Sequence, residues 1–218
     1  SNTPTAHRFA NRVALITGGT SGIGRATALA LAAEGARVVV AGRRQAEGDA
    51  VVADIVKAGG QALFVKTDVT REKDVEALVA RTVEAFGRLD IAFNNAGFEG
   101  SLGLLTEQTV ENYNGIFDAN VKGVFLSMKH EIPAMLQSFG GAIINTSSVA
   151  GSIGFPHFGL YVASKHAVIG LTRSTALEFA TQGIRVNSVS PAAIQTDMLD
   201  RAFGSGDSEA KKSMAVHH

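Results

Sequence analysis

The stretch VALITGGTSGIG, residues 13–24, decides the fold. Residues 13–17 form an apolar run with the length and β-branched content of a buried strand. The Ala- and Leu-rich residues 26–34 predict a helix that Gly35 ends. Between them Gly18, Gly22 and Gly24 have the spacing G-x-x-x-G-x-G, and glycine permits tight turns and the close approach of a ligand to the backbone. The stretch therefore predicts a strand, a tight glycine loop and a helix in direct succession.

This loop has the chemistry to hold the pyrophosphate of a dinucleotide. A helix N-terminus offers free N–H groups and the positive end of the helix dipole, and both favour an anion. The spacing differs from the commoner G-x-G-x-x-G and from a P-loop, which carries a lysine. A glycine-rich turn without a ligand is the alternative, but the position directly after the first strand favours the dinucleotide.

The same alternation of apolar runs and helical patterns continues along the chain. Strands are predicted at residues 13–17, 37–41, 62–65, 89–93, 142–145 and 184–189, and helices at 26–34, 49–57, 73–86, 110–136 and 161–180. Strands that are apolar throughout and alternate with helices indicate a parallel sheet covered on both faces. No linker interrupts the pattern, so residues 1–218 are predicted to form a single α/β domain, a Rossmann-type doubly wound parallel sheet.

The composition excludes several classes of protein. The 218 residues carry 20 Lys and Arg against 20 Asp and Glu, without the basic surplus of a nucleic-acid binder. Cysteine is absent, which excludes disulfides and Cys-based metal sites. No apolar run reaches the ~18 residues of a membrane span, and no signal peptide opens the chain. We expect a cytoplasmic protein without a nucleic-acid, membrane or metal partner.

Polar clusters follow two further predicted strands. Asp68 and Val69 come after the third strand, and residues 94–97, which read NNAG, come after the fourth. In open α/β sheets ligands bind outside the carboxyl ends of the strands, so these clusters and the glycine loop describe one crevice. Asp68 alone also fits a helix N-cap, and Asn94 also fits a structural amide that holds its loop.

A tyrosine and a lysine at the start of the last predicted helix form a candidate catalytic pair. Tyr161 and Lys165 are four residues apart and therefore share one helical face. An ammonium near a phenol stabilises the phenolate and lowers a pKa that starts near ~10. The hydroxyl cluster Thr146-Ser147-Ser148 follows the fifth strand and ends thirteen residues before the tyrosine, and a hydroxyl from it is able to reach the same reacting oxygen. Taken alone, Tyr161 also fits a core or surface aromatic.

Together these motifs resemble the short-chain dehydrogenase/reductase family, in its shorter soluble branch. The motifs T-G-x-x-x-G-x-G, D-V, N-N-A-G, a helix asparagine, S-x12-Y-x3-K and a proline turn occur in the family's order between about residues 13 and 198. Each motif is weak alone, but the ordered set is specific. The resemblance implies a hydride transfer between a nicotinamide cofactor and a ketone or secondary alcohol, a reaction that requires no metal.

The resemblance also implies a role for each matching residue. Tyr161 would be the general acid/base, Ser148 (with Ser147 as second choice) would orient the reacting oxygen, and Lys165 would hold the nicotinamide ribose and lower the pKa of Tyr161. Asn120 would support a water-linked proton relay. The expected cofactor-binding residues are Gly18, Ser21, Gly22, Ile23 and Gly24 at the pyrophosphate, Asp68 and Val69 at the adenine, Asn95, Ala96 and Gly97 beside its ribose, and Tyr161, Lys165, Pro191, Ile194 and Thr196 at the nicotinamide end.

The end of the second predicted strand indicates which cofactor is used. An acidic residue there binds the ribose hydroxyls of NAD, but this chain has Gly42 followed by Arg43 and Arg44. Arginine suits a 2′-phosphate through charge-assisted hydrogen bonds. We therefore predict NADP, with NAD as the alternative, and Arg43 as the first candidate for the phosphate ahead of Arg44. Two solvated arginines at a helix start are the other interpretation, and Ser21 is not the basic residue that many NADP-dependent members carry in the loop.

Two features depart from the family pattern. Residues 191–193 read Pro-Ala-Ala where the family usually has glycine after the proline, and alanine fits there if its φ is negative. Members of the family also usually continue with another helix and a seventh strand, so the 218 residues are expected to lack both.

Four residues and one segment near these motifs have two interpretations. Phe155 and Phe158 either line an apolar substrate pocket or belong to the core. His157 and Glu99 either contact substrate or, as we prefer, are polar loop residues, with Glu99 solvated. Residues 199–214, rich in Gly, Ser and charge, are interpreted as a mobile lid over the substrate.

The main alternative to an enzyme is a catalytically inactive dinucleotide-binding regulatory or scaffold protein. The intact set of Ser148, Tyr161, Lys165 and Asn120 argues against it, since a binding module needs no proton relay. A nucleotide-binding methyltransferase of similar fold has no role for S-x12-Y-x3-K. The resemblance alone implies a homo-oligomer, a tetramer or a dimer, joined through the helices at residues 110–136 and 161–180.

Overall fold

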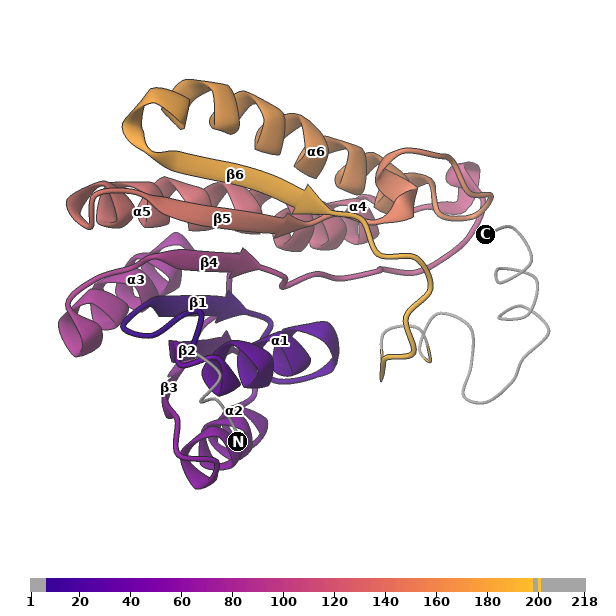
Figure 1. Ribbon diagram of the computed structural model, residues 1–218. Coiled ribbons are helices and arrows are strands. Elements are labelled where there is room, and N and C mark those ends of the chain that lie inside the picture. The colour runs from indigo at the N-terminus through magenta and orange to yellow at the C-terminus, as the bar shows by residue number, and fades with distance from the viewer. Residues whose placement is uncertain (1–6, 198–199, 201–218) are drawn as a thin grey trace, which may run out of the picture.

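A computed structural model describes residues 7–197 and 200, and its strands form one parallel sheet (Figure 1). The strand order is β3-β2-β1-β4-β5-β6, and every pair of neighbours is parallel. The strands are β1 (Val13–Thr17), β2 (Arg37–Gly42), β3 (Gln61–Lys66), β4 (Ile91–Asn94), β5 (Gly141–Thr146) and β6 (Ile184–Val189). This order reverses at β1, which confirms the predicted Rossmann-type doubly wound sheet.

Helices cover the sheet on both faces because alternate strand residues point to opposite sides. Ile16 belongs to the core shared with α1 (Gly22–Ala33) and α2 (Gln45–Lys57). Leu15 belongs to the core shared with α3 (Glu72–Phe86), α5 (Gly123–Gln137) and α6 (Gly159–Phe179). Three single 3₁₀ turns, η1 (Leu105–Glu107), η3 (Val149–Gly151) and η4 (Ala180–Gln182), complete the connections.

The helix predicted at residues 110–136 is not one uniform α-helix. It consists of α4 (Val110–Phe117), a π-helical segment η2 (Asp118–Lys122) and α5. A π-helical segment inserts an extra residue into the turn and is frequent at functional sites. Here it contains Asn120, whose side chain is fully buried.

A network of buried polar side chains links the sheet to the helices on the α3, α5 and α6 face. The amide nitrogen of Asn94 in β4 donates to Oε2 of Glu131 in α5 (3.0 Å) and to Oδ1 of Asn145 in β5 (3.0 Å). The amide nitrogen of Asn145 in turn donates to Oγ1 of Thr172 in α6 (3.0 Å). Asn94 is therefore a structural amide, one of the two roles expected for it.

Glu131 is the titratable member of this network. Burial raises its pKa to about 7, and the hydrogen bond from Asn94 only partly opposes that rise. Its second oxygen, Oε1, is buried without a hydrogen-bond partner among the described residues. A buried carboxyl in such a place is more stable protonated than ionised.

The raised pKa predicts how stability depends on pH. The folded pKa of Glu131 lies above the ordinary value of 4.5, so its contribution is fully present below that value and is lost as the pH rises through about 7. We expect the Tm of the wild type, relative to Glu131→Gln, to fall by about 3 °C or more between mildly acidic and mildly alkaline buffer. Thermal unfolding followed by circular dichroism measures it.

Glu76→Gln, at an exposed position of α3, is the matched control and should keep the pH dependence of the wild type. A Glu131→Gln protein with the same pH dependence as the wild type would contradict the assignment.

Candidate active site

The carboxyl ends of β1 and β4 are joined by a threonine hydroxyl. Oγ1 of Thr17 accepts hydrogen bonds from the backbone N–H groups of Asn95 (3.1 Å) and Ala96 (3.2 Å). The side-chain amide of Asn95 donates to the carbonyl oxygen of Gly18 (3.2 Å). The glycine loop and the NNAG segment are therefore one rigid unit, as the crevice described by the sequence requires.

The glycine loop itself fits a pyrophosphate. Gly18 and Gly22 have φ values of +63° and +50°, which side chains rarely adopt, and a Cβ at Gly24 would collide with the carbonyl oxygen of Gly18. Ser21 is the N-cap of α1 but makes no side-chain cap hydrogen bond. The first N–H groups of α1, around Ile23, are thus left uncapped by that side chain, which suits an anionic ligand.

The segment after β6 connects the glycine loop to the neighbourhood of Ser148. The N–H of Val149 donates to the carbonyl oxygen of Pro191 (3.1 Å). A Cβ built at Gly22 would lie 3.2 Å from Cγ2 of Thr196, so these two residues are in contact range. Ile194 lies between Pro191 and Thr196 in sequence and is exposed. Most of the expected lid, residue 199 and residues 201–214, lies outside the described residues.

Asp68 and Val69 follow β3 as predicted. Oδ1 of Asp68 accepts from the N–H (3.0 Å) and the hydroxyl (2.8 Å) of Thr70, whereas the N-cap of α3 is Arg71, so Asp68 is not that helix's N-cap. Burial raises the pKa of Asp68, but the Thr70 hydrogen bonds and the charges of Arg43 and Arg71 outweigh burial and lower it overall. Val69 packs toward Gly123, where a Cβ would lie 2.9 Å from Cγ2 of Val69.

The two arginines after β2 lie on two sides of the strand end. Arg43 is exposed, and its positive charge is close enough to Asp68 to help lower the pKa of that carboxyl. Arg44 donates to the hydroxyls of Ser21 (2.8 Å) and Thr20 (3.2 Å) in the glycine loop. A Cβ at Gly42 would lie 2.8 Å from Cγ2 of Thr20, so a larger side chain at this strand end would require Thr20 to shift.

Tyr161, Ser148 and Lys165 are brought together from β5 and α6. The hydroxyl of Ser148 hydrogen-bonds to Tyr161, while Ser147 is buried and donates instead to the carbonyl oxygen of Lys165 (3.0 Å). The ammonium of Lys165 donates to the carbonyl oxygen of Thr146 (2.9 Å) and lies 5.5 Å from the centre of the Tyr161 ring. Of the two serines, it is thus Ser148 that faces the tyrosine.

Burial has the largest effect on the pKa values of Tyr161 and Lys165. Burial raises the pKa of Tyr161 above 10, the Ser148 hydrogen bond opposes the rise, and the negative charge of Glu99 adds to it. Burial likewise lowers the pKa of Lys165 to about 8. The pKa of Tyr161 therefore moves in the opposite direction from the one expected, because the Lys165 ammonium is directed to Thr146 and does not offset the cost of ionising a buried phenol.

The side chain of Asn120 fixes the loop beside these residues. Oδ1 of Asn120 accepts from the N–H of Phe98 (2.7 Å), and its amide nitrogen donates to the carbonyl oxygen of Phe98 (2.9 Å) and to Oγ of Ser164 (3.0 Å). Gly97 lies next to this contact, since a Cβ there would be 3.4 Å from Oδ1 of Asn120 and 3.6 Å from Nζ of Lys165. The side chain has a positioning role, and its part in a proton relay stays a prediction.

Two aromatic residues continue the site outward. The rings of Phe155, Phe158 and Tyr161 form a chain of edge-to-face contacts with centroids 6.3 and 6.4 Å apart. Both phenylalanines are partly exposed, which favours the lining of a pocket over the core. His157 is exposed and its carbonyl oxygen accepts from the N–H of Gly103 (3.1 Å), in agreement with a polar loop residue.

Sequence reasoning did not assign roles to several residues that shape the site. These are Thr17, Thr146, Ser164 and Asn112, which act through their backbone or through hydrogen bonds to backbone. Thr17 belongs to the T-G-x-x-x-G-x-G motif and Thr146 to the hydroxyl cluster after the fifth strand, whereas Ser164 and Asn112 carry no spacing signal. Glu99 was assigned to solvent and is instead buried.

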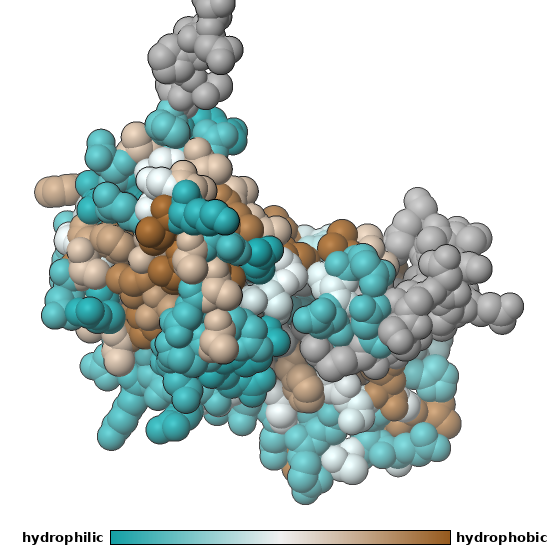
Figure 2. Space-filling view, turned by 90° about the horizontal axis from the view of Figure 1, so that it is seen from below, coloured by the Kyte–Doolittle hydropathy of each residue, from teal (hydrophilic) through white to brown (hydrophobic). Residues whose placement is uncertain are grey.

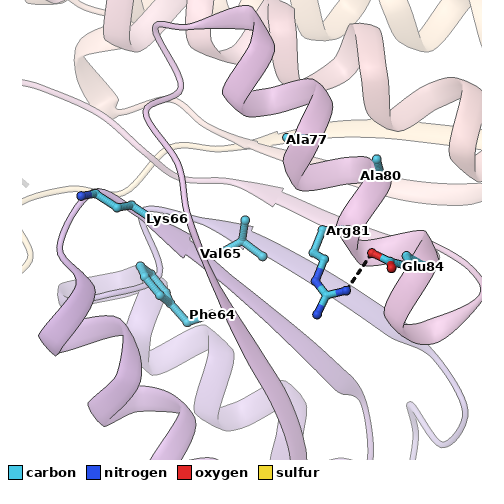
Figure 3. A pocket seen from close by; sticks show the side chains of 7 residues that line it. All are labelled: Phe64, Val65, Lys66, Ala77, Ala80, Arg81 and Glu84. Carbon is cyan, nitrogen blue, oxygen red and sulfur yellow. Dashed lines mark hydrogen bonds and ion pairs between the residues drawn. The ribbon is translucent and has the colours of Figure 1, made fainter.

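An open groove of about 700 Å³ lies at the β3 edge of the sheet (Figures 2 and 3). It is lined by Phe64, Val65, Lys66, Ala77, Ala80, Arg81 and Glu84. Arg81 and Glu84 form an ion pair across its α3 side (2.7 Å). None of the predicted site residues lines this groove. Arg81 and Glu84 neutralise each other's charge in their ion pair.

The described residues hold neither a membrane-spanning helix nor a cluster of metal ligands. Among residues 7–197 and 200, no helix is both long and apolar enough to span a membrane. Within the same part of the chain no three His, Asp or Glu side chains are grouped to hold a metal ion.

Comparison with known proteins gives the same assignment. The family model described as short chain dehydrogenase matches residues 12–205. The chain is 45% identical to cyclohexanol dehydrogenase of Acinetobacter sp. (strain SE19) over 89% of its own length and 77% of that protein. It is 46% identical to 3beta-hydroxysteroid dehydrogenase of Mediterraneibacter gnavus over 89% of its length and 70% of that protein.

A solved structure agrees with these matches. The crystal structure of levodione reductase superposes with a TM-score of 0.90 at 39% sequence identity, over 95% of this chain and 81% of that one. The family model alone extends over most of the chain, from β1 past β6. The chain therefore belongs to the short-chain dehydrogenase family.

Proposed function

We propose that this protein is an NADP-dependent oxidoreductase that interconverts a secondary alcohol and a ketone, with Tyr161 as the general acid/base. The observation that carries the proposal is the contact of the Ser148 hydroxyl with the half-buried Tyr161, next to a buried lysine. A phenol and a neighbouring hydroxyl are the two groups needed to protonate and orient one carbonyl oxygen.

Tyr161, Ser148 and Lys165 have separate roles in the proposed reaction. When bound, the nicotinamide supplies or accepts the hydride at the substrate carbon. In the reducing direction Tyr161 donates its proton to the carbonyl oxygen, and Ser148 donates a hydrogen bond that holds this oxygen in place. The high pKa of Tyr161 keeps the phenol protonated at neutral pH. Lys165, fixed by Thr146, is the residue that holds the nicotinamide ribose.

NADP is favoured over NAD by the end of β2. No acidic residue stands at position 42, where a Cβ would lie 2.8 Å from Cγ2 of Thr20, and Arg43 and Arg44 border the adenine side and the glycine loop. Arg44 already uses part of its guanidinium on Ser21, Thr20 and Glu47. Arg43 is therefore the first candidate for the 2′-phosphate. The other cofactor-binding residues are proposed to be those assigned from the sequence.

The substrate class is an alicyclic secondary alcohol or ketone. Two of the relatives are named for cyclohexanol and for a hydroxysteroid, whose reacting carbons belong to rings. Phe155 and Phe158 present apolar surface next to Tyr161, and apolar surface of this kind suits a saturated ring.

The protein is further proposed to be a cytoplasmic homo-oligomer built from one domain per chain, a tetramer or a dimer. Large apolar side chains are exposed on the helices expected at the interface, namely Val110 and Tyr113 on α4, Phe125 on α5 and Leu177 on α6. Exposed apolar residues grouped on a few helices are typical of surfaces buried by association. Sedimentation velocity tests this assembly.

The role of Tyr161 is tested by removing one oxygen atom. Tyr161→Phe should lower kcat for cyclohexanone reduction by about 100-fold or more, because the proton donor is lost, while NADPH binding changes little. Tyr113→Phe removes the chain's other tyrosine, which is exposed on α4, and should keep the activity of the wild type. Initial rates of NADPH consumption measure both, and a Tyr161→Phe enzyme that retains most of its activity would refute the role.

The arginines are tested by binding alone. Arg43→Ala should weaken NADPH binding by about 10-fold or more while changing NADH binding much less, because only the 2′-phosphate pairs with the guanidinium. Arg44→Ala should show the same pattern more weakly. Arg81→Ala, an arginine on α3 outside the site, is the control. Fluorescence titration measures the Kd values, and equal losses for both cofactors in Arg43→Ala would sink the assignment.

A further inference from the structure

Glu131 is a buried acid that the proposed reaction does not use. It belongs to α5, and only 1% of its surface is exposed. Its Oε2 accepts a hydrogen bond from the side-chain amide of Asn94, the last residue of β4 (3.0 Å). Burying a carboxyl costs free energy unless its hydrogen bonds compensate for that cost. The helix therefore places an expensive side chain directly against a strand end that borders the site.

Asn94 connects Glu131 to the neighbouring strand. It is paired in register with Asn145 of β5, and its amide nitrogen also donates to Oδ1 of Asn145 (3.0 Å). An amide nitrogen has two hydrogens, so the carboxyl and the second asparagine use both. The carboxyl of Glu131 thus helps to fix how the ends of β4 and β5 lie side by side.

Asn145 extends the network to both helices that cover this face. Its amide nitrogen lies 3.3 Å from Sδ of Met128 on α5 and 3.0 Å from Oγ1 of Thr172 on α6. Thr172 is buried and lies seven residues after Lys165, a spacing that places both side chains on one face of the helix. A buried network whose hydrogen bonds are made holds its members rigidly. The strand ends and the helix that carries Lys165 are therefore held in one arrangement.

Each asparagine of the network is followed directly in sequence by a residue whose backbone shapes the site. The backbone N–H of Asn95 donates to Oγ1 of Thr17 (3.1 Å), which ties the NNAG segment to β1. The carbonyl oxygen of Thr146 accepts from the ammonium of Lys165 (2.9 Å). A shift of either strand end moves these groups with it, and a misplacement of about 1 Å is enough to slow an enzyme about 100-fold.

The two side chains of the first contact each have one oxygen left over. Oε1 of Glu131 and Oδ1 of Asn94 are both buried without a hydrogen-bond partner among the described residues. An ionised carboxylate offers only acceptors, whereas a protonated carboxyl also offers an O–H donor. Burial raises the pKa of Glu131 to about 7, which agrees with the protonated form. Glutamine, with one acceptor and one donor group, is the closest substitute for that form.

We propose that Glu131 is a positioning residue of the active site, which through Asn94 and Asn145 fixes the ends of β4 and β5 next to the residues that hold the cofactor. The inference rests on the proposed function and adds to it a side chain that touches neither substrate nor cofactor. Loss of the carboxyl leaves one N–H of the Asn94 amide without its acceptor, which is costly for a buried donor. The amide, and the strand end that carries it, then move toward another acceptor.

One substitution that removes the acceptor and one that keeps it test the proposal. Glu131→Leu has a side chain of similar size without an acceptor, so kcat for cyclohexanone reduction at saturating NADPH should fall by about 10-fold or more. Glu131→Gln still accepts from Asn94 and should stay within about 3-fold of the wild type. Initial rates of NADPH consumption measure both values, and circular dichroism confirms that both proteins are folded.

Met135→Ala controls for a general loss of stability. Met135 lies one turn after Glu131 on α5, is fully buried, and packs against Gly141 at the start of β5, the end of the strand away from the site. The substitution leaves a cavity in the same core, so it should lower the Tm. Because it leaves the asparagine network intact, kcat should stay within about 3-fold of the wild type.

A second measurement needs no turnover. Lys165 and the NNAG segment are expected at the two riboses, which NADPH and NADH have in common. Glu131→Leu should therefore weaken the binding of both cofactors equally, by about 3-fold or more, while Glu131→Gln and Met135→Ala keep the Kd values of the wild type. A Kd measured with the cofactor in excess does not depend on the fraction of folded molecules, so a merely structural role would not change it. Fluorescence titration measures these Kd values.

The outcomes separate this inference from the proposed function. A loss of kcat and of binding in Glu131→Leu, restored in Glu131→Gln and absent in Met135→Ala, supports the positioning role. The role is overturned if Glu131→Leu keeps its kcat, if Glu131→Gln is impaired as strongly, or if Met135→Ala loses as much. If the wild type binds NADPH but does not reduce cyclohexanone or any other ketone, the proposed function fails. The Kd values then decide on Glu131: equal losses for both cofactors in Glu131→Leu support its role, and unchanged values overturn it.

Discussion

The side-chain amide of Asn120 is the contact on which the site depends. It joins the loop after β4, through Phe98, to α6, through Ser164. Ser164 lies between Tyr161 and Lys165 in sequence. Its hydroxyl donates a hydrogen bond to the carbonyl oxygen of Tyr161 (2.7 Å). One amide therefore links the helix turn that carries Tyr161 to the loop after β4. The π-helical segment around Asn120 is the local distortion that accompanies this buried position.

Burial at the ends of the strands gives the site its electrostatic character. Lys165 and Tyr161 are both costly to ionise there, and their pKa values move in opposite directions for the same reason. The closest backbone acceptor, Thr146, holds the ammonium without neutralising it. In such surroundings a fixed charge acts over a longer range than in water.

Much of the fold was predictable because its signals are local. The strands at 13–17 and 184–189 were predicted to the residue. The first is an apolar run that Gly18 ends, and the second begins with alternating apolar and polar residues between Gly183 and Pro191. The helix starts were less accurate: α1 begins at Gly22 and α2 at Gln45, four residues earlier than predicted in each case. The pair of Tyr161 and Lys165 was predicted from helical spacing, whereas Ser148 was singled out by the family resemblance. The π-helical turn, the hydrogen bonds of Asn112 and the burial of Glu99 depend on contacts between distant segments, which no local pattern encodes.

The end of β2 shows how the fold restricts the choice of cofactor. Thr20 of the glycine loop packs so close to Gly42 that a Cβ there would lie 2.8 Å from its methyl group, and its hydroxyl accepts from Arg44. A larger side chain at position 42, such as the acid that binds the ribose hydroxyls of NAD in many dinucleotide-binding folds, would require the methyl group of Thr20 to shift. Because that methyl group belongs to the glycine loop, the packing of the loop and the side chain allowed at the end of β2 are linked.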